Sequence, residues 1–443
     1  EPGIYVEPKF SPKGNNIVFR RLTGGYLLSP EWSLEPGIYL ADRKAKTMEK
    51  VTEDGFNAHF AADEDRLYFT DYAPDSKYTE LELYSVDLKG RDERTLLRGD
   101  KVTEYQLSPD GKWIGYTHQN NAFVAPFLST GLQQELDIEG SGLPVAQVSK
   151  RAGEYLSWSA GSDRLSWSHG ATVFSRELNQ AFSFLAGTPD ELPEPVSEGL
   201  NLGFSQIADK PNSTIALVGG QVVTMRDADN VQEVISNGVV VVQDNRIVAV
   251  GKVGEVSIPA EAQIIDVSGK TLTPGLIDGH AHGSQANEEI IPQQNWKNLS
   301  SLAFGVTTIH DPSNDSSEIF AASEMQRSGQ ILGPRIFSTG TIVYGANSPT
   351  AHAKIDSYED AFFHLQRLKD MGAVSVKSYN QPRREQRQQV LNAARDLELM
   401  VVPEGGGKLY QNMSMIADGH TTLEHSLNIA TGYSDLTQFW SQT

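Results

Sequence analysis

The sequence predicts a multidomain chain, built of β-strands in its first half and of alternating strands and helices in its second half. Two observations lead to this prediction. A strand-turn-strand pattern recurs four times in the first two hundred residues, and beyond residue 276 short apolar strands alternate with helical segments. Such alternation is typical of parallel sheets, and 443 residues give room for roughly two to four domains.

The composition argues against several classes of function. Charged residues make up 21% of the chain and hydrophobic residues 39%, as in ordinary globular proteins. The net charge of −20 argues against a nucleic-acid partner, because phosphate binding needs a basic surface. There is no cysteine, so a metal site must use His, Asp, Glu or a modified Lys. No apolar run approaches the roughly 20 residues of a membrane-spanning helix.

The four repeats predict a β-propeller over residues 1–205. Each has an apolar residue, a turn rich in Ser, Pro, Asp and Gly, and an alternating strand, and they begin at Phe10, Phe60, Leu107 and Trp158. Repeats of about 40–50 residues built of short strands are typical of propeller blades. The turn Ser108-Pro-Asp-Gly-Lys112 resembles the Tol-type propeller repeat, which favours a periplasmic or secreted location. With about four blades visible, the low end of the usual range, we expect the propeller to be truncated.

A second β region is predicted over residues 213–273, after a linker with three prolines at 192–212. The apolar stretches 238–242 and 246–250 flank Asp244-Asn245, which is a hairpin signal. Ser268-Gly269 marks another turn.

Strands and helices alternate in residues 274–443. The six candidate strands cover 276–282, 306–311, 335–341, 374–379, 399–404 and 422–426. A helix is expected between the third and fourth strands, because Ser357 and Asp360 have capping-box spacing and Gly372 follows the last apolar turn. A second helix is expected over residues 384–397, where apolar residues recur at helical spacing.

The most informative motif is Thr273-Pro-Gly-Leu-Ile-Asp-Gly-His-Ala-His-Gly283. Leu276-Ile277 is expected to begin a buried strand. Side chains alternate along a strand, so His280 and His282 would point to the same face. Two neighbouring imidazoles can bind a metal ion, and a solvent-facing histidine pair is the alternative.

This motif and its flanks resemble the amidohydrolase superfamily of metal-dependent hydrolases. The match runs from about Ser213 to the C-terminus and includes Ala216-Leu-Val-Gly-Gly220, Asp244-Asn-Arg-Ile-Val-Ala-Val-Gly251 and Ile265-Asp-Val-Ser-Gly-Lys-Thr-Leu-Thr-Pro-Gly-Leu-Ile-Asp278. The resemblance implies a (β/α)8 TIM-type barrel over 274–443, flanked by a small β-sandwich at 213–273. Six strands are visible where eight are needed, so we expect an incomplete barrel.

The resemblance also assigns metal ligands at the C-terminal ends of the strands, where such barrels carry their active sites. His280 and His282 would bind the more buried metal. Lys377, in the fourth strand, would be carboxylated by carbon dioxide and bridge two metals. A buried ammonium is costly, which favours this role over the alternative of a lysine on a solvated face.

The fifth and sixth strands would deliver Glu404 and His425. His425 matches the sixth-strand histidine that binds the second metal, while Glu424 is expected to point away, into the helix layer. Glu404 stands where the family has histidine; it can ligate zinc, act as a general base or pair with an arginine. The catalytic aspartate of the eighth strand, which takes the proton from the attacking water, is expected beyond Thr443, so the catalytic residue stays unassigned.

Three further residues are candidates for substrate binding. His310 follows the second strand, and Tyr379 and Arg383 follow the fourth. Arg383 suits a substrate carboxylate, which guanidinium groups bind in a bidentate manner; a surface arginine is the alternative. His420 precedes the sixth strand and is expected to be structural.

Together these features predict a metal-dependent hydrolase that cleaves an amide bond by metal-activated water, with one or two divalent ions, zinc first. The segment Val376-Lys-Ser-Tyr-Asn-Gln-Pro382, with the fused propeller, resembles peptidase-like amidohydrolases, which implies a dipeptide or short-peptide substrate. Two alternatives stay open. One is a propeller-based scaffold for a protein partner with a degenerate barrel, and the other is a cyclic-amide or lactone hydrolase.

Overall fold

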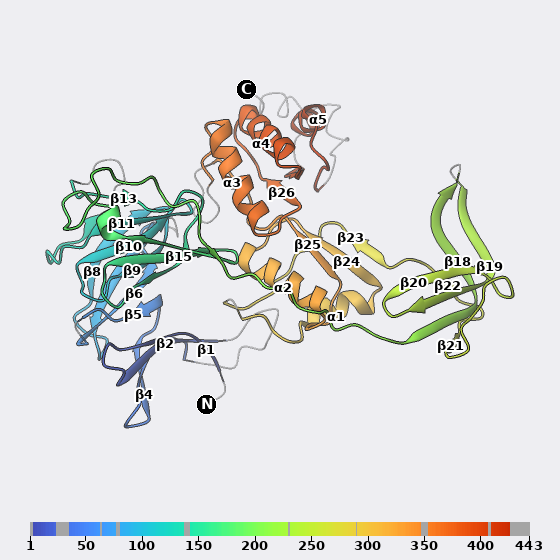
Figure 1. Cartoon of the computed structure of the whole chain (residues 1–443), viewed down its shortest axis with the longest axis horizontal. Helices are drawn as coiled ribbons and strands as arrows, with labels where there is room; N and C mark the ends of the chain where they lie inside the picture. The colour runs from blue at the N-terminus through green and yellow to red at the C-terminus, as the bar shows by residue number, and fades with distance from the viewer. Residues whose placement is uncertain are drawn as a thin grey trace.

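The computed structural model describes residues 3–23, 35–62, 64–76, 80–136, 142–228, 231–288, 290–346, 353–405 and 409–425. Three regions follow one another along the long axis of the molecule (Figure 1). Antiparallel sheets from the N-terminal half lie at one end, parallel strands with helices lie in the middle, and a sheet of long strands lies at the other end.

The described part of the N-terminal region contains four successive sheets. Within each sheet, strands that follow one another along the chain lie next to each other, apart from the last strand of some sheets. Neighbouring strands are antiparallel except for β12, which runs parallel to β8. The strands are β1 (Ile4–Phe10), β2 (Asn16–Leu22), β3 (Gly37–Asp42), β4 (Thr47–Thr52), β5 (Phe56–His59), β6 (Arg66–Tyr72), β7 (Glu80–Asp87), β8 (Arg94–Asp100), β9 (Val102–Leu107), β10 (Trp113–His118), β11 (Asn121–Pro126), β12 (Gln134–Glu135), β13 (Ala146–Gln147), β14 (Glu154–Trp158), β15 (Arg164–His169), β16 (Thr172–Glu177) and β17 (Leu200–Asn201).

Each sequence repeat spans the turn between the first two strands of one of these sheets. The turns share a backbone hydrogen bond: the Ser108 N–H donates to the Trp113 carbonyl at 2.8 Å, and the Ser159 N–H donates to the Arg164 carbonyl at 2.9 Å. The repeat in the sequence is therefore a repeat in the structure. A propeller, and its Tol-type character, stay predictions.

The sheet at the far end is built around two long strands, β18 (Thr214–Ala228) and β19 (Val231–Gln243). The others are β20 (Arg246–Lys252), β21 (Gln263–Asp266) and β22 (Thr271–Leu272). Gln243 faces Arg246 across a two-residue turn, so the predicted hairpin at Asp244-Asn245 is confirmed. The five strands form one sheet, and a sandwich stays a prediction.

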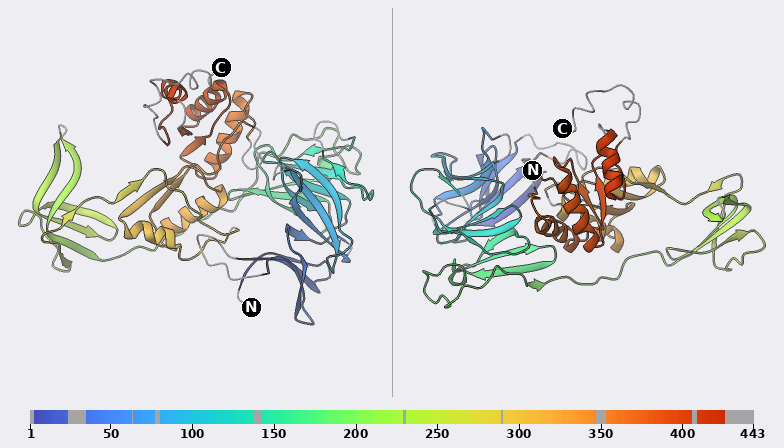
Figure 2. Two further views of the ribbon diagram at one scale, coloured as in Figure 1. Left: turned by 180° about the vertical axis from the view of Figure 1, so that it is seen from behind. Right: turned by 90° about the horizontal axis from the view of Figure 1, so that it is seen from above.

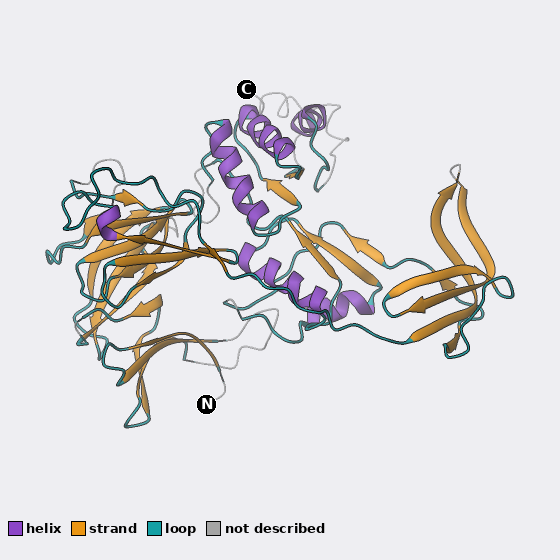
Figure 3. Ribbon diagram, in the orientation of Figure 1, coloured by secondary structure: helices purple, strands orange, loops and turns teal. Residues whose placement is uncertain are grey.

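In the described part of the middle region there are five short strands, all paired in parallel as predicted. They are β23 (Leu276–Asp278), β24 (Val306–Asp311) and β25 (Arg335–Ser338) in one sheet, and β26 (Ser375–Ser378) and β27 (Met400–Pro403) in another. Figure 3 shows the helices beside them: α1 (Trp296–Ala303), α2 (Ser316–Ser328), α3 (Tyr358–Asp370), α4 (Arg384–Asp396) and α5 (Leu409–Asp418). No closed sheet is found among the described strands.

Helices α3 and α4 lie where the sequence predicted them. The Ser357 hydroxyl accepts a hydrogen bond from the Asp360 N–H at 3.1 Å and caps α3. Gly372, with φ of 112°, allows the turn that follows the helix. Leu365 and Val390, one from each helix, are fully buried together with Val376 of β26, and this core holds β26 in place.

Two predicted strands differ from the structure. Leu276 and Ile277 are 59% and 73% exposed, so the expected buried strand is wrong. Among the described strands, the short β23 pairs with β24 alone. Residues 422–425 form no strand. They follow Thr421, whose N–H donates to the Val401 carbonyl at 3.0 Å. Ser426 lies outside the described residues.

The N-terminal sheets contact the middle region through polar groups. Arg20 pairs with Glu288 at 2.5 Å, and Arg151 pairs with Asp370 at 3.6 Å. The connection to the far sheet runs past the end of α2 (Figure 2), and there the Asp209 N–H donates to the Ser328 carbonyl at 2.7 Å. In the part of the chain that the structure describes, no helix is long and apolar enough to cross a membrane.

Candidate metal centre

His280 and His282 lie on the loop that follows β23. The Asp278 carboxylate accepts the His280 N–H at 3.0 Å, and the Ala281 N–H donates to the His310 carbonyl at 2.9 Å, which fixes the loop against β24. The Nε2 atoms of the two imidazoles face each other at 3.0 Å. The predicted pairing of the two side chains is therefore present, on a loop rather than on a strand.

Lys377 and Glu404 face each other from the two strands of the second sheet. Lys377 pairs with Val402 in the register of β26 and β27, and the Glu404 N–H donates to the Ser378 carbonyl at 3.0 Å. The Lys377 ammonium is 2.8 Å from Glu404 Oε2, and the lysine side chain is only 2% exposed. The alternative of a lysine on a solvated face is wrong.

Glu404 also contacts His425. Its Oε1 atom lies 2.8 Å from His425 Nε2. One carboxylate thus joins a lysine from the preceding strand to a histidine that lies twenty-one positions further along the chain. Of the roles left open for Glu404, pairing with an arginine is not what the structure shows, since its cationic partner is Lys377.

Glu424 points toward the histidine loop, and the expectation that it points away is wrong. Its Oε2 contacts His280 Nδ1, and the residue is 8% exposed. The expectation assumed the alternation of a strand. His425 instead has a φ of 61°, in the left-handed region, so the two neighbouring side chains can face the same site.

These contacts bring all five predicted metal ligands into one group. The His280 ring lies 4.8 Å from the His282 ring and 5.0 Å from the His425 ring, which links the two sheets. We call this group the His–Lys–Glu cluster; it consists of His280, His282, Lys377, Glu404 and His425. Burial, and then the charge of Lys377, lowers the pKa of His280. The lowered pKa favours neutral imidazole, the form that binds metals.

The side chains of the cluster are of the types that bind divalent metal ions. Imidazole nitrogen and carboxylate oxygen are zinc ligands, and two nitrogens that bind one tetrahedral zinc ion are about 3.3 Å apart. The Nε2 atoms of His280 and His282 are 3.0 Å apart, slightly closer than that. Among the described residues, however, no three His, Asp or Glu side chains are already gathered around one point. The donors meet in pairs.

Asp311 is a residue of the site that the sequence reasoning did not assign. It is 1% exposed, and its Oδ1 is 3.5 Å from His282 Nδ1. The Ser313 N–H and the Asn314 amide donate to its carboxylate at 3.0 and 2.8 Å. Burial raises the pKa of Asp311. Asp311 ends a predicted strand directly after His310, and this position could have indicated it as a site residue.

The substrate-binding candidates separate into two groups. His310 and Tyr379 lie near the cluster: His310 Nε2 is 2.8 Å from the Ser375 hydroxyl on β26, and burial, then the charge of Glu404, raises the pKa of Tyr379. Arg383 does not join them, because its guanidinium pairs with Asp356 at 3.0 Å and with Glu385 at 2.9 Å.

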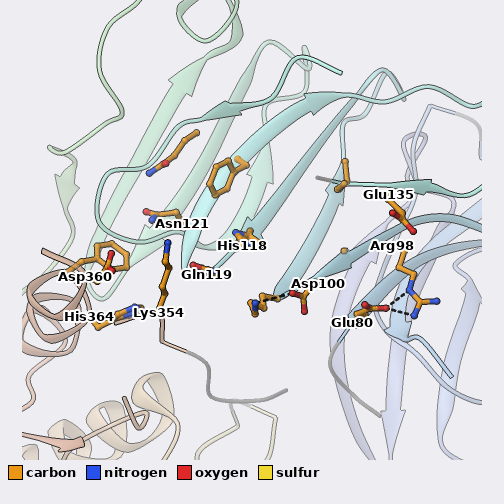
Figure 4. A pocket seen from close by; sticks show the side chains of 16 residues that line it. Glu80, Arg98, Asp100, His118, Gln119, Asn121, Glu135, Lys354, Asp360 and His364 are labelled. Atoms are coloured by element: carbon orange, nitrogen blue, oxygen red, sulfur yellow. Dashed lines mark hydrogen bonds and ion pairs between the residues drawn. The ribbon is translucent and has the colours of Figure 1, made fainter. Parts of the chain in front are cut away.

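A cavity of about 790 Å³ lies elsewhere, between the N-terminal sheets and α3 (Figure 4). Its lining residues include Glu80, which pairs with Arg98, and His118 and His364 from the two sides. None of its lining residues belongs to the His–Lys–Glu cluster. The cavity and the candidate chemistry are therefore at different places.

Comparisons with curated proteins find local sequence similarity. An imidazolonepropionase of Fusobacterium nucleatum subsp. nucleatum is 42% identical over 82 residues, covering 16% of this chain and 20% of the relative. An imidazolonepropionase of Bacillus cereus is 27% identical over 177 residues, which cover 37% of this chain and 34% of the relative. Adenine deaminase 4 of Rhizobium meliloti is 40% identical over 70 residues, which cover 16% of this chain and 11% of the relative. These matches support the resemblance to the amidohydrolase superfamily. The chain spans about a fifth to a third of the length of the imidazolonepropionases.

No protein-family model matches the chain. Solved structures give weak similarities. A prolidase-like protein of Bifidobacterium longum has a TM-score of 0.42 at 26% identity, covering 48% of this chain and 55% of that one. A Xaa-Pro dipeptidase has a TM-score of 0.39 at 20% identity, and the match covers 51% of this chain and 63% of that one.

Proposed function

We propose that the chain belongs to a metal-dependent hydrolase that cleaves an amide bond, a C–N bond that is not an ester. The observation that supports this proposal most is the His–Lys–Glu cluster. His280 contacts His282 at 3.0 Å, and Glu404 contacts Lys377 and His425 at 2.8 Å each. The two sets lie side by side, with the His280 and His425 rings 5.0 Å apart. The sequence similarity to imidazolonepropionases agrees with hydrolysis of the amidohydrolase type.

His280, His282, Glu404 and His425 would hold one or two divalent ions, zinc first. A bound divalent ion lowers the pKa of a water molecule and polarises a carbonyl group. The side chains of the site supply the rest. Tyr379 and His310 border the cluster and would contact the substrate. No residue is assigned to take the proton from water.

Lys377 would be carboxylated only when metal is present. The ammonium would lose one proton to solvent, and the amine would then add to carbon dioxide, forming an N–C bond as one C=O π bond opens and losing a second proton to solvent. The product is an anion, and it would lie against the Glu404 carboxylate that now pairs with the ammonium. Two carboxylates in contact disfavour each other's charged forms, so this modification needs a cation between them.

We propose a dipeptide or short peptide as the substrate. A cyclic amide is a second candidate, and the relatives named imidazolonepropionase favour it, because an imidazolone ring contains a cyclic amide. A protein partner of the N-terminal sheets and a periplasmic or secreted location stay proposals from the sequence.

A substrate panel tests the proposal. The full chain, loaded with zinc or manganese, would be assayed on dipeptides, cyclic amides, lactones and simple esters. We expect slow, metal-dependent hydrolysis of an amide, because no residue of the site is assigned to take the proton from water. This activity should be lost in His282→Ala and kept in His420→Ala, because His420 bonds the Met415 carbonyl outside the cluster. Hydrolysis that persists after chelation, or activity on esters alone, would contradict it.

A further inference from the structure

We propose that Glu424 is a positioning residue for His280: its carboxylate holds the proton on Nδ1 and so directs the lone pair of Nε2 toward His282. This inference rests on the proposed function, because it concerns how a ligand of the proposed metal is oriented. Glu424 stands outside the predicted ligand set.

The tautomer argument starts from the contacts of His280. Glu424 Oε2 contacts Nδ1, and His282 Nε2 lies 3.0 Å from Nε2. In a neutral imidazole one nitrogen is a donor and the other an acceptor. An ionised carboxylate only accepts, so Nδ1 carries the proton and Nε2 has the free lone pair. A partner on the far nitrogen is the usual way in which a metal-binding histidine is oriented.

His282 has a longer contact on its far nitrogen. Its Nδ1 is 3.5 Å from the buried carboxylate of Asp311, and its Nε2 faces His280. With the proton of His280 on Nδ1, its Nε2 is the acceptor of the 3.0 Å hydrogen bond, and His282 Nε2 is the donor in the metal-free chain. A metal ion held by both nitrogens would displace that proton. The Glu424 carboxylate therefore pre-arranges the lone pair of His280 Nε2.

The Glu424 carboxylate is itself held in place. The Thr422 hydroxyl donates to its Oε1 at 3.1 Å, which leaves Oε2 for His280. The Gly405 backbone also approaches Glu424 closely, since a Cβ on Gly405 would lie 2.2 Å from the Glu424 carbonyl oxygen. Glu424 thus ties the segment after α5 to a loop 144 positions earlier in the chain.

Two variants of the full chain test this inference. Glu424→Ala removes the acceptor, and we expect the affinity for zinc, measured by competition with a chelator, to fall about 10- to 100-fold. Glu424→Gln keeps a carbonyl acceptor and should lose less than about tenfold. Glu385→Ala is the control, because this glutamate is 67% exposed and pairs only at the surface with Arg383.

Nitrogen NMR of the histidine rings in the metal-free protein gives a second readout. His280 should carry its proton on Nδ1 in the wild type and in Glu424→Gln, and should populate both tautomers in Glu424→Ala. Unchanged tautomers and wild-type affinity in Glu424→Ala would overturn the inference. If the wild type binds no zinc, the proposed function fails, and the tautomer in the metal-free chain still decides the role of Glu424.

Discussion

Lys377 and Glu404 show how much of the site depends on a single carboxylate. Glu404 Oε2 is 2.8 Å from the buried ammonium of Lys377, and its Oε1 is 2.8 Å from His425. Burying a charge is costly unless it is paired. In the structure Glu404 pairs with this ammonium, so one carboxylate holds both the lysine and the histidine of the site.

We predict that Glu404→Gln destabilises the protein by about 3 kcal/mol. Removing one partner of a buried ion pair costs about 3–5 kcal/mol, and the lower end applies because the Glu404 side chain is 13% exposed. Urea unfolding measures the change. Glu385→Gln, which breaks an exposed pair with Arg383, should cost less than about 1 kcal/mol. Equal stability of Glu404→Gln and the wild type would contradict the buried pairing.

The sequence could identify the five cluster residues but not their contacts. His280, His282 and His425 stand in motifs that carry the family resemblance, and Glu404 ends a strand. The contact of Glu424 with His280 could not be predicted, because it depends on a left-handed backbone at His425, a conformation that non-glycine residues rarely adopt. The sequence could have indicated Asp311 as a site residue, because it follows His310 at the end of a predicted strand.

At the scale of elements, the segment 421–425 depends on its fit against the end of β27. The Val401 N–H donates to the Thr421 hydroxyl at 3.1 Å. Gly405 lies so close to Glu424 that a Cβ there would meet its carbonyl oxygen at 2.2 Å and the Leu423 side chain at 3.1 Å. The close approach of these two backbones requires glycine.

We therefore predict that Gly405→Ala displaces Glu424 and His425 and weakens zinc binding by at least about tenfold, the usual effect of disturbing a group behind a metal ligand. Competition with a chelator measures it. Gly279→Ala is the control, because a Cβ at Gly279 meets no atom within 4 Å. An unchanged affinity in Gly405→Ala would show that the segment is not positioned by this contact.

Helices were predicted better than strands because their signals are local. The cap at Ser357 and the apolar spacing of α4 lie within one segment of sequence, and the predicted 384–397 agrees closely with Arg384–Asp396. The first strand was expected to be buried, and the sixth strand was expected at 422–426. Both depend on pairing between distant residues, which the sequence of one segment does not specify.

Replacing Ser357 tests the cap of α3. Ser357→Ala should destabilise the protein by about 1 kcal/mol, because the Asp360 N–H loses its acceptor. Ser357→Asp keeps an acceptor at this position and should lose less. Urea unfolding of both variants checks the prediction, and an equal loss in the two would mean that packing, rather than capping, sets the effect.

At the scale of the whole molecule, the regions are joined by a few polar contacts. Arg20 with Glu288 and Arg151 with Asp370 connect the N-terminal sheets to the middle region. Pairs of this kind contribute at most about 1 kcal/mol each when exposed. The order of the regions along the chain was predicted from composition and repeats, whereas their relative placement (Figure 1) rests on contacts between residues far apart in sequence.

The most direct test of the central proposal is the metal content of the full chain. After dialysis against zinc and removal of the excess, elemental analysis should find one or two ions per chain in the wild type. The His280→Ala, His282→Ala double variant should lose at least one of them, while His420→Ala keeps them all. A wild-type chain without bound metal, or a double variant with the full complement, would contradict a metal centre at the His–Lys–Glu cluster.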